Sequence, residues 1–265
     1  MMQFIIGIIK DVNNYMKYAP NQNVLYEIIG ILSEADLPLV FKGANVTNIL
    51  LKQSNSPYTR RTTDIDSSWK GENPTTEGIE SLLKSALKPY GYTVEKIREL
   101  KGKQVSAGFR VLKDGIPVTK MDIDIHNVKQ CEKYSIGTVE FTGVTAEEII
   151  ADKLCAVSNG HVYRRSKDLM DIYSLTEALN INMNDVIESI NFSNHKLGSF
   201  GELALNKEKI FEAYSNLKVS NKPDFDEMYE CVLNYAKDIS KKKNQKSELS
   251  VNIDIADGFD DKDIE

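Results

Sequence analysis

Two D-x-D motifs constrain this chain most, because each places two carboxylates on one face of a predicted β-strand. The first lies in TTDID, with Asp64 and Asp66, and the second in KMDIDI, with Asp122 and Asp124. Residues i and i+2 of a strand point to the same face, about 6–7 Å apart. Like charges this close destabilise a fold unless a cation lies between them. If the two strands pair, three or four carboxylates meet in one place.

Such a cluster predicts a site for a divalent cation. Mg²⁺ prefers oxygen ligands in octahedral geometry, and carboxylates that hold one or two such ions serve phosphoryl and nucleotidyl transfer. A single D-x-D is more often a solvated strand face, but a second one weakens that alternative. Upstream, Gly43 follows the apolar run LPLVF and opens a predicted helix. The backbone N–H groups of such a turn can receive a phosphate.

Hydrophobic periodicity predicts an α+β first part and a mostly helical second part. The Asp114–Gly115 pair predicts a β-hairpin, and Thr145 with Glu148 forms a capping box at a helix start. We expect three parts: an α+β domain over 1–143, a helical domain over 144–242, and an acidic, disordered tail over 243–265. The predicted helices cover 23–36, 46–54, 76–88, 145–160, 166–180 and segments around 183–191, 201–217 and 224–240; the predicted strands cover 37–42, 62–69, 92–100 and 106–128.

Composition excludes several classes of protein. Hydrophobic residues make up 41% of the 265 residues and charged residues 27%, which is ordinary for a soluble globular chain. The early apolar run FIIGII is too short to span a membrane and no cleavage site follows it, so we expect a cytoplasmic protein without membrane contact. The three cysteines and three histidines are scattered, which argues against a disulfide framework, a zinc site or a histidine-based catalytic site.

The net charge of −6 is concentrated at one end. Residues 247–265 hold seven acids and one lysine, so the chain before them sums to zero. The overall charge therefore says little about whether the body carries a basic face for phosphates. We expect the acidic tail to be a solvated end, with charge mimicry of nucleic acid or docking of a partner as alternatives.

The order strand, glycine turn, helix, D-x-D strand and later acidic strand resembles the DNA polymerase β-like nucleotidyltransferase superfamily. Within it, ADKLCAVSNG followed by RRSKDLMDIYSL resembles the AbiEii/AbiGii toxin family, bacterial nucleotidyltransferases usually encoded beside an antitoxin. The resemblance covers roughly residues 25–180. The matching motifs are a glycine turn, an R-x-[ST]-x-D-x-D strand, a helical lysine and an R-x-K-D-x-x-D helix, which fall at Gly43; at Arg60, Thr62, Asp64 and Asp66; at Lys153; and at Arg165, Lys167, Asp168 and Asp171.

This resemblance implies a polymerase-β-like domain, with a mixed sheet and flanking helices, followed by a helical bundle. It implies that Asp64 and Asp66 ligate Mg²⁺, with Mn²⁺ as an alternative, bound to a nucleoside triphosphate. Lys153 would neutralise phosphate charge and Asp168 would complete the catalytic set. Further nucleotide contacts would come from Gly43, Ala44, Asn45, Arg60, Thr62, Lys167 and Asp171.

Two assignments stay open at this stage. Asn45 stands where the family usually has a hydroxyl, and its side-chain amide could donate to phosphate instead. The third carboxylate is Asp122 or Asp124, and we prefer Asp124. The residues also have purely structural interpretations: Lys153 lies beside an apolar stripe, from which lysines usually extend to solvent, and Arg165 would pair with Asp168.

The function implied is metal-dependent transfer of a nucleotide from a nucleoside triphosphate to an RNA, such as a tRNA 3′ end, or to a protein hydroxyl. The chain would act as the toxin of a toxin–antitoxin or phage-defence pair, with a cognate antitoxin as partner. One alternative is a small-molecule nucleotidyltransferase of the aminoglycoside type, which an acidic acceptor pocket would favour. The other is a degenerate fold that only binds a partner.

Overall fold

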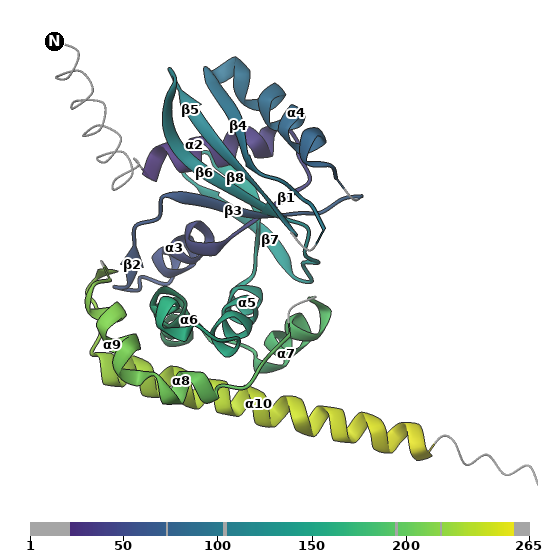
Figure 1. Cartoon of the computed structure of the whole chain (residues 1–265), viewed down its shortest axis with the longest axis vertical. Coiled ribbons are helices and arrows are strands. Elements are labelled where there is room, and N and C mark those ends of the chain that lie inside the picture. Colours follow the sequence, from purple (N-terminus) through teal and green to yellow (C-terminus); the bar gives the residue numbers. More distant parts are fainter. Residues whose placement is uncertain (1–21, 73, 103–104, 194–195, 218, 257–265) are drawn as a thin grey trace, which may run out of the picture.

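The computed structural model describes residues 22–256, except residues 73, 103–104, 194–195 and 218 (Figure 1). A sheet and its flanking helices form the first part, and further helices follow. The elements are α2 (Gln22–Glu34), β1 (Leu39–Lys42), α3 (Gly43–Gln53), β2 (Thr59–Arg60), β3 (Asp64–Trp69), α4 (Thr76–Leu87), η1 (Lys88–Tyr90), β4 (Tyr92–Arg98), β5 (Ser106–Lys113), β6 (Ile116–Asp124), β7 (Cys131–Ile136), β8 (Val139–Val144), α5 (Ala146–Ser158), η2 (Val162–Arg164), α6 (Ser166–Ala178), α7 (Met183–Phe192), α8 (Gly201–Leu205), α9 (Lys207–Ser215), β9 (Val219–Ser220) and α10 (Phe225–Ala256).

The main sheet has seven strands in the order β4-β5-β6-β3-β1-β8-β7. It is mixed, because β3 runs parallel to β6 and β1 parallel to β8, while the other pairs are antiparallel. The two D-x-D strands are therefore direct neighbours, as the sequence predicted. Their register sets Asp66 opposite Asp122 and Ser68 opposite Asp124. This pairing brings both motifs to one part of the sheet.

Helices α2 and α4 lie against the sheet on one side, and α3, α5 and α6 lie below β1 and β3 in the view of Figure 1. Helix α2 buries Leu25, Ile28, Ile29 and Leu32, which recur at helical spacing. Ile65 lies between the two aspartates of β3, points to the opposite face and is fully buried. Burial of one face of β3 thus leaves its carboxylates on the other.

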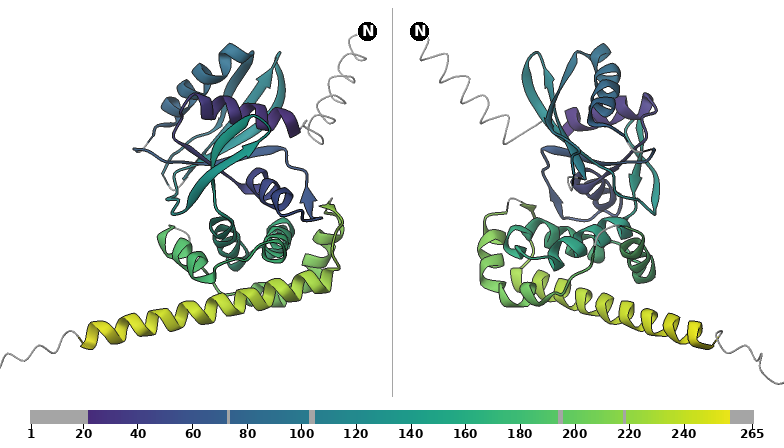
Figure 2. Two further views of the ribbon diagram at one scale, coloured as in Figure 1. Left: turned by 180° about the vertical axis from the view of Figure 1, so that it is seen from behind. Right: turned by 45° about the vertical axis from the view of Figure 1, so that its right-hand side comes forward.

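The second part of the chain consists mainly of helices. Helix α5 contacts α6 and α7, and α10 packs along α6 and α7. Figures 1 and 2 show that the last turns of α10 extend past these helices. A mixed sheet with flanking helices followed by helices is the α+β architecture that we predicted, and that prediction is confirmed. Of the described helices, none has the length and apolar character needed to cross a membrane.

Three elements differ from the sequence prediction. The β7–β8 hairpin was not predicted. Gly137 lies at its turn and has φ +61°. The helix expected over 201–217 is two helices, α8 and α9. Helix α10 continues to Ala256 through part of the segment expected to be a disordered tail, because a helix that is already nucleated by packing extends at little cost per residue. The apolar run FIIGII and residues 257–265 lie outside the described residues.

The predicted boundary near residue 143 coincides with the end of β8, and α5 begins two residues later. The buried apolar side chains on both sides of this boundary form one continuous cluster. The division into two domains therefore stays a prediction. The three cysteines are free thiols.

Gly43 forms the junction between β1 and α3. Its φ of +66° lies in the left-handed region, which favours glycine. A Cβ atom at this position would lie 2.3 Å from Oδ2 of Asp66. The glycine therefore serves two purposes, because it makes the sharp turn and leaves room for the Asp66 carboxylate at the start of α3.

We predict that Gly43→Ala lowers the free energy of unfolding by about 2–3 kcal/mol, since it adds a clash to backbone strain. The matched control is Gly137→Ala, whose φ is +61° and whose added Cβ would meet nothing within 4 Å. This control should lose only about 1 kcal/mol. Urea denaturation measures both losses, and equal losses would refute the close approach of Asp66.

Candidate active site

The carboxylates of β3 occupy a face held in place by α3. Asp64 and Asp66 are half-buried. Asn45, which is 1% exposed, donates from its side-chain nitrogen to the backbone oxygen of Asp64 (2.9 Å) and accepts from Nε2 of Gln22 (3.1 Å). This differs from the predicted role of Asn45 as a phosphate donor. The side chain is buried and bonded within the fold, where it fixes β3 against α3.

Asp66 lies in an environment that opposes its charge. Burial raises the pKa of Asp66 to about 6, and the nearby charges of Asp122 and Asp64 act in the same direction. The ammonium groups of Lys42 and Lys153 oppose this rise. A carboxylate with a raised pKa next to other carboxylates is a common feature of functional sites, because a bound cation relieves the repulsion.

Lys42 was not singled out from the sequence, yet it joins this cluster. Its ammonium forms ion pairs with Oδ2 of Asp124 on β6 and with Oδ2 of Asp152 on α5, the latter at 3.4 Å. Burial alone would lower the pKa of Lys42, and the charges of Asp152 and Asp124 raise it above its usual value. The only local signal in the sequence was a lysine directly before the glycine turn.

The two candidates for the third carboxylate have different surroundings. Asp124 accepts hydrogen bonds from the Ser68 hydroxyl (2.7 Å) and the His126 backbone N–H (3.2 Å). Burial opposes its charge, but His126, Lys42 and Ser68 together hold the pKa of Asp124 well below its usual range. Asp122 lies opposite Asp66, is 40% exposed and pairs with Arg98 at 2.5 Å.

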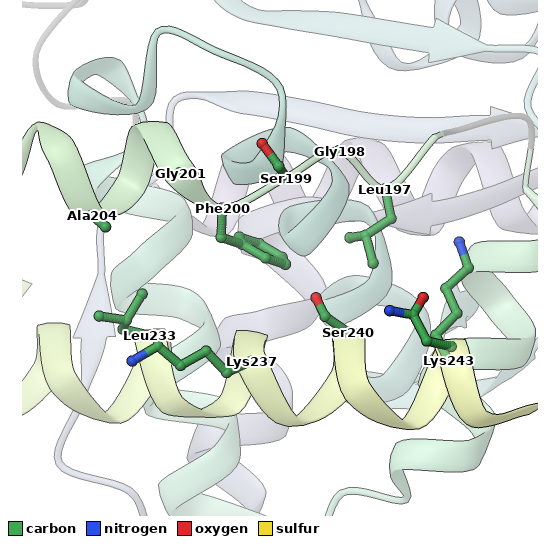
Figure 3. A pocket seen from close by; sticks show the side chains of 11 residues that line it. Leu197, Gly198, Ser199, Phe200, Gly201, Ala204, Leu233, Lys237, Ser240 and Lys243 are labelled. Atoms are coloured by element: carbon green, nitrogen blue, oxygen red, sulfur yellow. The ribbon is translucent and has the colours of Figure 1, made fainter.

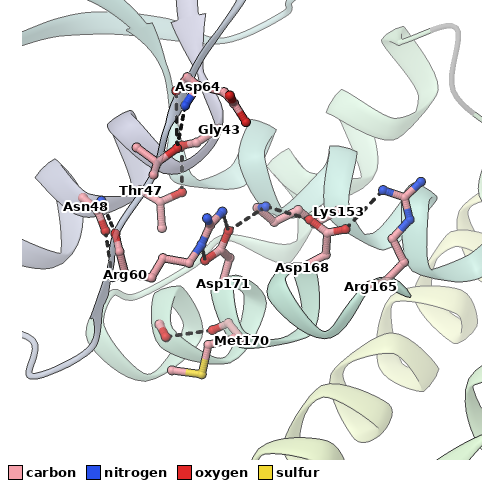
Figure 4. A network of polar contacts seen from close by, with 12 residues as sticks. Gly43, Thr47, Asn48, Arg60, Asp64, Lys153, Arg165, Asp168, Met170 and Asp171 are labelled. Carbon is pink, nitrogen blue, oxygen red and sulfur yellow. Dashed lines mark hydrogen bonds and ion pairs between the residues drawn. The ribbon is translucent and has the colours of Figure 1, made fainter. Parts of the chain in front are cut away.

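A second network lies beside the first, on α5 and α6 (Figure 4). The guanidinium of Arg60 donates to both oxygens of Asp171, at 2.8 and 2.7 Å. The ammonium of Lys153 lies 2.7 Å from Oδ2 of Asp171 and 3.0 Å from Oδ1 of Asp168. Arg165 reaches the other oxygen of Asp168 at 3.4 Å. Four predicted site residues thus form one network, and Arg165 pairs with Asp168 as its structural interpretation required.

Charge in this network is buried and compensated. Burial would raise the pKa of Asp171, but Lys153 and Arg60 lower it to about 2. Buried ion pairs of this kind are destabilising when one partner is lost. The charge of Lys153 also reaches Asp66, where it opposes the rise in the pKa of that carboxyl group.

The remaining predicted residues fall into two groups. Ala44 and Thr62 are buried, and the Thr62 hydroxyl lies 3.3 Å from the backbone oxygen of Asp64. Lys167 is exposed on α6 and has no role in the network of Figure 4. Asn48 was not predicted, but it holds the Arg60 backbone through two hydrogen bonds, at 2.8 and 3.3 Å.

The donor set on β3 suits a hard cation. In the part of the chain that the structure describes, no group of three or more His, Cys, Asp or Glu side chains is arranged to hold a metal alone. Asp64 and Asp66 offer oxygen donors on one face. Gly43 has no side chain and therefore leaves room for the Asp66 carboxylate. Two carboxylates match Mg²⁺, which usually takes its other ligands from water and substrate phosphates.

A separate pocket of about 630 Å³ lies between the segment 197–204 and α10 (Figure 3). Phe200 and Leu233 contribute apolar surface, and Lys237 and Lys243 lie along the α10 side. None of the lining residues belongs to the predicted site, so this pocket plays no part in the chemistry discussed below.

Solved structures and curated proteins were compared with the chain. An antigenic nucleotidyltransferase-like protein from Paracoccidioides brasiliensis is 13% identical and has a TM-score of 0.42, and the match covers 73% of this chain and 91% of that one. The Megavirus polyadenylate synthase is 14% identical with the same TM-score, and the match covers 72% of this chain and 42% of that one. No curated protein matches the chain.

The family comparison is more extensive. Residues 25–245 match the family described as "Nucleotidyl transferase AbiEii toxin, Type IV TA system". This match extends beyond the motifs into α10. The α+β fold with its C-terminal helices is accordingly the fold of a chain that matches this nucleotidyl transferase family over most of its length. The chain belongs to the AbiEii family of nucleotidyl transferase toxins.

Proposed function

We propose that this chain is a metal-dependent enzyme that transfers a nucleotide from a nucleoside triphosphate to an RNA hydroxyl, such as a tRNA 3′ end. The observation that carries this proposal is the position of Asp64 and Asp66. On one side of them lies the ion-pair network around Lys153, whose three cations outnumber its two carboxylates by one charge and so suit a triphosphate. On the other side lies the outer face of β6, β5 and β4, which suits an acceptor.

The triphosphate side is assigned to α3 and the Lys153 network. Gly43 opens α3, and the first N–H groups of a helix favour an anion. Lys153 is a compact cation that can neutralise phosphate, and Arg60 with Asp171 holds it in place. We assign a positioning role to Arg60 and Asp171, because their charges are already satisfied by each other.

Asp64 and Asp66 would hold the divalent ion together with the phosphates. When bound, this ion neutralises charge on the phosphates of the triphosphate and orients them. We expect either Mg²⁺ or Mn²⁺ to serve, because both accept carboxylate and phosphate oxygens.

The reaction forms one bond and breaks one. The acceptor hydroxyl oxygen attacks the α-phosphorus, the bond from the α-phosphorus to the oxygen that bridges it to the β-phosphate breaks, and pyrophosphate leaves. We assign the hydroxyl proton to Asp122 rather than to Asp124, which we preferred from the sequence. Asp122 lies directly across from Asp66, and its side chain is 40% exposed and paired with Arg98, whereas Asp124 is only 14% exposed and is bonded to Lys42 and Ser68. Most of the rate enhancement would come from positioning and charge neutralisation.

Charge on the outer sheet face favours RNA as the acceptor. In the register of the sheet Lys120 lies opposite Asp64, and Arg110 lies next to Lys120 and pairs with Glu95 at 3.5 Å. Arg98 adds a third cation beside Asp122. Glycine at position 108, between Arg98 and Asp122, leaves this surface flat. Such a strip can contact successive phosphates, whereas a cationic small molecule would need an acidic pocket.

The family match also bears on partners. Its description places the family in a type IV toxin–antitoxin system. We therefore propose a cognate antitoxin as partner, a role in phage defence, and a cytoplasmic location, where RNA and nucleoside triphosphates are available.

Our first prediction concerns transfer itself. Purified protein with Mg²⁺, total bacterial RNA and each α-³²P-labelled triphosphate should yield a labelled RNA band of tRNA size. Asp64→Asn should lower this labelling by about a thousandfold or more, because the metal loses a charged ligand. Denaturing gel electrophoresis of the labelled products measures the effect.

The matched control is Asp36→Asn, which changes a carboxylate on the loop after α2. Its labelling should equal that of the wild type. Label in protein would contradict RNA as the acceptor. No label, together with no binding of any Mg²⁺-triphosphate in calorimetry, would contradict the enzymatic proposal and favour a module that only binds a partner.

The second prediction concerns stability and pH. The folded pKa of Asp66 is raised from 3.8 to about 6, so the folded chain keeps this proton to higher pH than the unfolded chain. Stability should therefore fall as pH rises from about 4 to about 6 and stay lower above that. In EDTA at pH 7.5, Asp66→Asn should be more stable than the wild type by about 1–3 kcal/mol. At pH 4 this gain in stability should shrink. Thermal unfolding of both proteins at both pH values tests it, and a melting temperature of Asp66→Asn below that of the wild type at pH 7.5 would refute it.

The third prediction concerns the outer sheet face. Arg110→Glu combined with Lys120→Glu should raise KM for RNA about tenfold or more and reduce the salt dependence, because two phosphate contacts are lost. Affinity for Mg²⁺-triphosphate should not change. Lys241→Glu on α10, exposed and outside the site, is the control. An unchanged KM for RNA in the double variant would place the acceptor elsewhere.

A further inference from the structure

Lys42 lies where a second metal ion would be expected in a site of this kind. In two-metal sites, the second ion lies about 3.5–4 Å from the first and is held by a shared carboxylate and a third one. Here the third-strand carboxylate Asp124 is in contact with the Lys42 ammonium, and Asp152 approaches the same ammonium at 3.4 Å. Lys42 is also the Cα partner of Asp66 across β1 and β3. Its charge lowers the pKa of Asp66.

Both oxygens of Asp124 already have partners. Oδ1 accepts from the Ser68 hydroxyl at 2.7 Å and from the His126 backbone N–H at 3.2 Å. Oδ2 contacts Lys42, and Nδ1 of His126 lies 3.4 Å from it. The Lys42 and Asp124 side chains are only 16% and 14% exposed. A metal ion could bind Asp124 only by displacing a buried ammonium from it.

We propose that Lys42 takes the place of the second metal ion, so that this enzyme works with a single divalent ion on Asp64 and Asp66. This inference rests on the proposed function. It adds that β1, α5 and β6 build an internal cation site, with Asp152 as the carboxylate that balances Lys42.

The chemistry of an ammonium fits part of the role of a metal. It carries one positive charge and three N–H donors, which neutralise the carboxylates and hold Asp124 and Asp152 in place. It has no vacant site for an oxygen ligand, so it cannot bind the acceptor hydroxyl as a metal can. The hydroxyl proton is then left to Asp122, which is half-buried beside Arg98 and lies opposite Asp66.

The test counts metal ions. Free Mn²⁺ is measured by electron paramagnetic resonance while Mn²⁺ is titrated into the full chain. Wild type should bind one Mn²⁺ per chain, and Lys42→Gln should bind one more, because Asp124 and Asp152 lose their internal cation. Lys42→Gln with Asp152→Asn should return to the wild-type number. The control Lys241→Gln, an exposed lysine on α10 outside the site, should not change the count.

Thermal unfolding gives a second readout that needs no activity. Without metal, Lys42→Gln should unfold at a lower temperature than the wild type, because Asp124 and Asp152 lose the ammonium that they share. Added Mn²⁺ should restore more stability to Lys42→Gln than it adds to the wild type. If Lys42→Gln does not fold, Lys42→Met with and without Mn²⁺ during refolding provides the same comparison.

Two results would overturn the inference: two Mn²⁺ ions already bound to the wild type, or an unchanged count in Lys42→Gln. Failure of the proposed function looks different. A wild type that binds no Mn²⁺, with one ion bound to Lys42→Gln, would support the internal cation and contradict the metal site at Asp64 and Asp66.

Discussion

Compensation of buried negative charge is the constraint on which this structure depends. The parallel pairing of β3 and β6 sets Asp66 opposite Asp122 and brings Asp124 close by. Carboxylates at this spacing repel one another in a partly buried site. The ammonium of Lys42 compensates this negative charge on one side, and the ammonium of Lys153 does so on the other. The fold therefore gathers both carboxylates and ammonium groups at the place where a polyanionic substrate and its cation would bind.

The two lysines connect different elements of the fold. Lys42 ends β1 and joins the sheet to α5 through Asp152. Lys153 lies on α5 and joins α6 to the β2 segment through Asp171 and its bidentate partner Arg60. The helical part is thus tied to the sheet by ion pairs at the site itself. Binding at the site would therefore alter the ion pairs that join the two parts, because the same side chains belong to the site and to the junction.

Much of the fold could be predicted from local signals. Period-two alternation around Ile65, the Asp114–Gly115 turn and the Thr145 capping box each specify an element over a few residues. The β7–β8 hairpin was missed because its strands carry many polar residues. Helix α10 was predicted over 224–240, but its continuation to Ala256 was missed because a polar segment looks like a tail when its packing is unknown. In the candidate site, motif spacing predicted Asp64, Asp66, Lys153 and Asp168 as members, and their roles stay predictions. It assigned Asn45 to phosphate, whereas burial assigns this side chain to the β3 backbone.

By itself, the sequence determined which residue types were available and on which face of each element they lie, because strand and helix periodicity are local properties. It also determined the family, since the motifs recur in a set order. Only the tertiary structure decided which of these residues meet. Lys42 contacts Asp124 and Asp152, which lie 82 and 110 positions away, and Arg60 forms a bidentate pair with Asp171. These contacts depend on strand order, register and helix packing. These are set by burial summed over the whole chain, which no short window of sequence records.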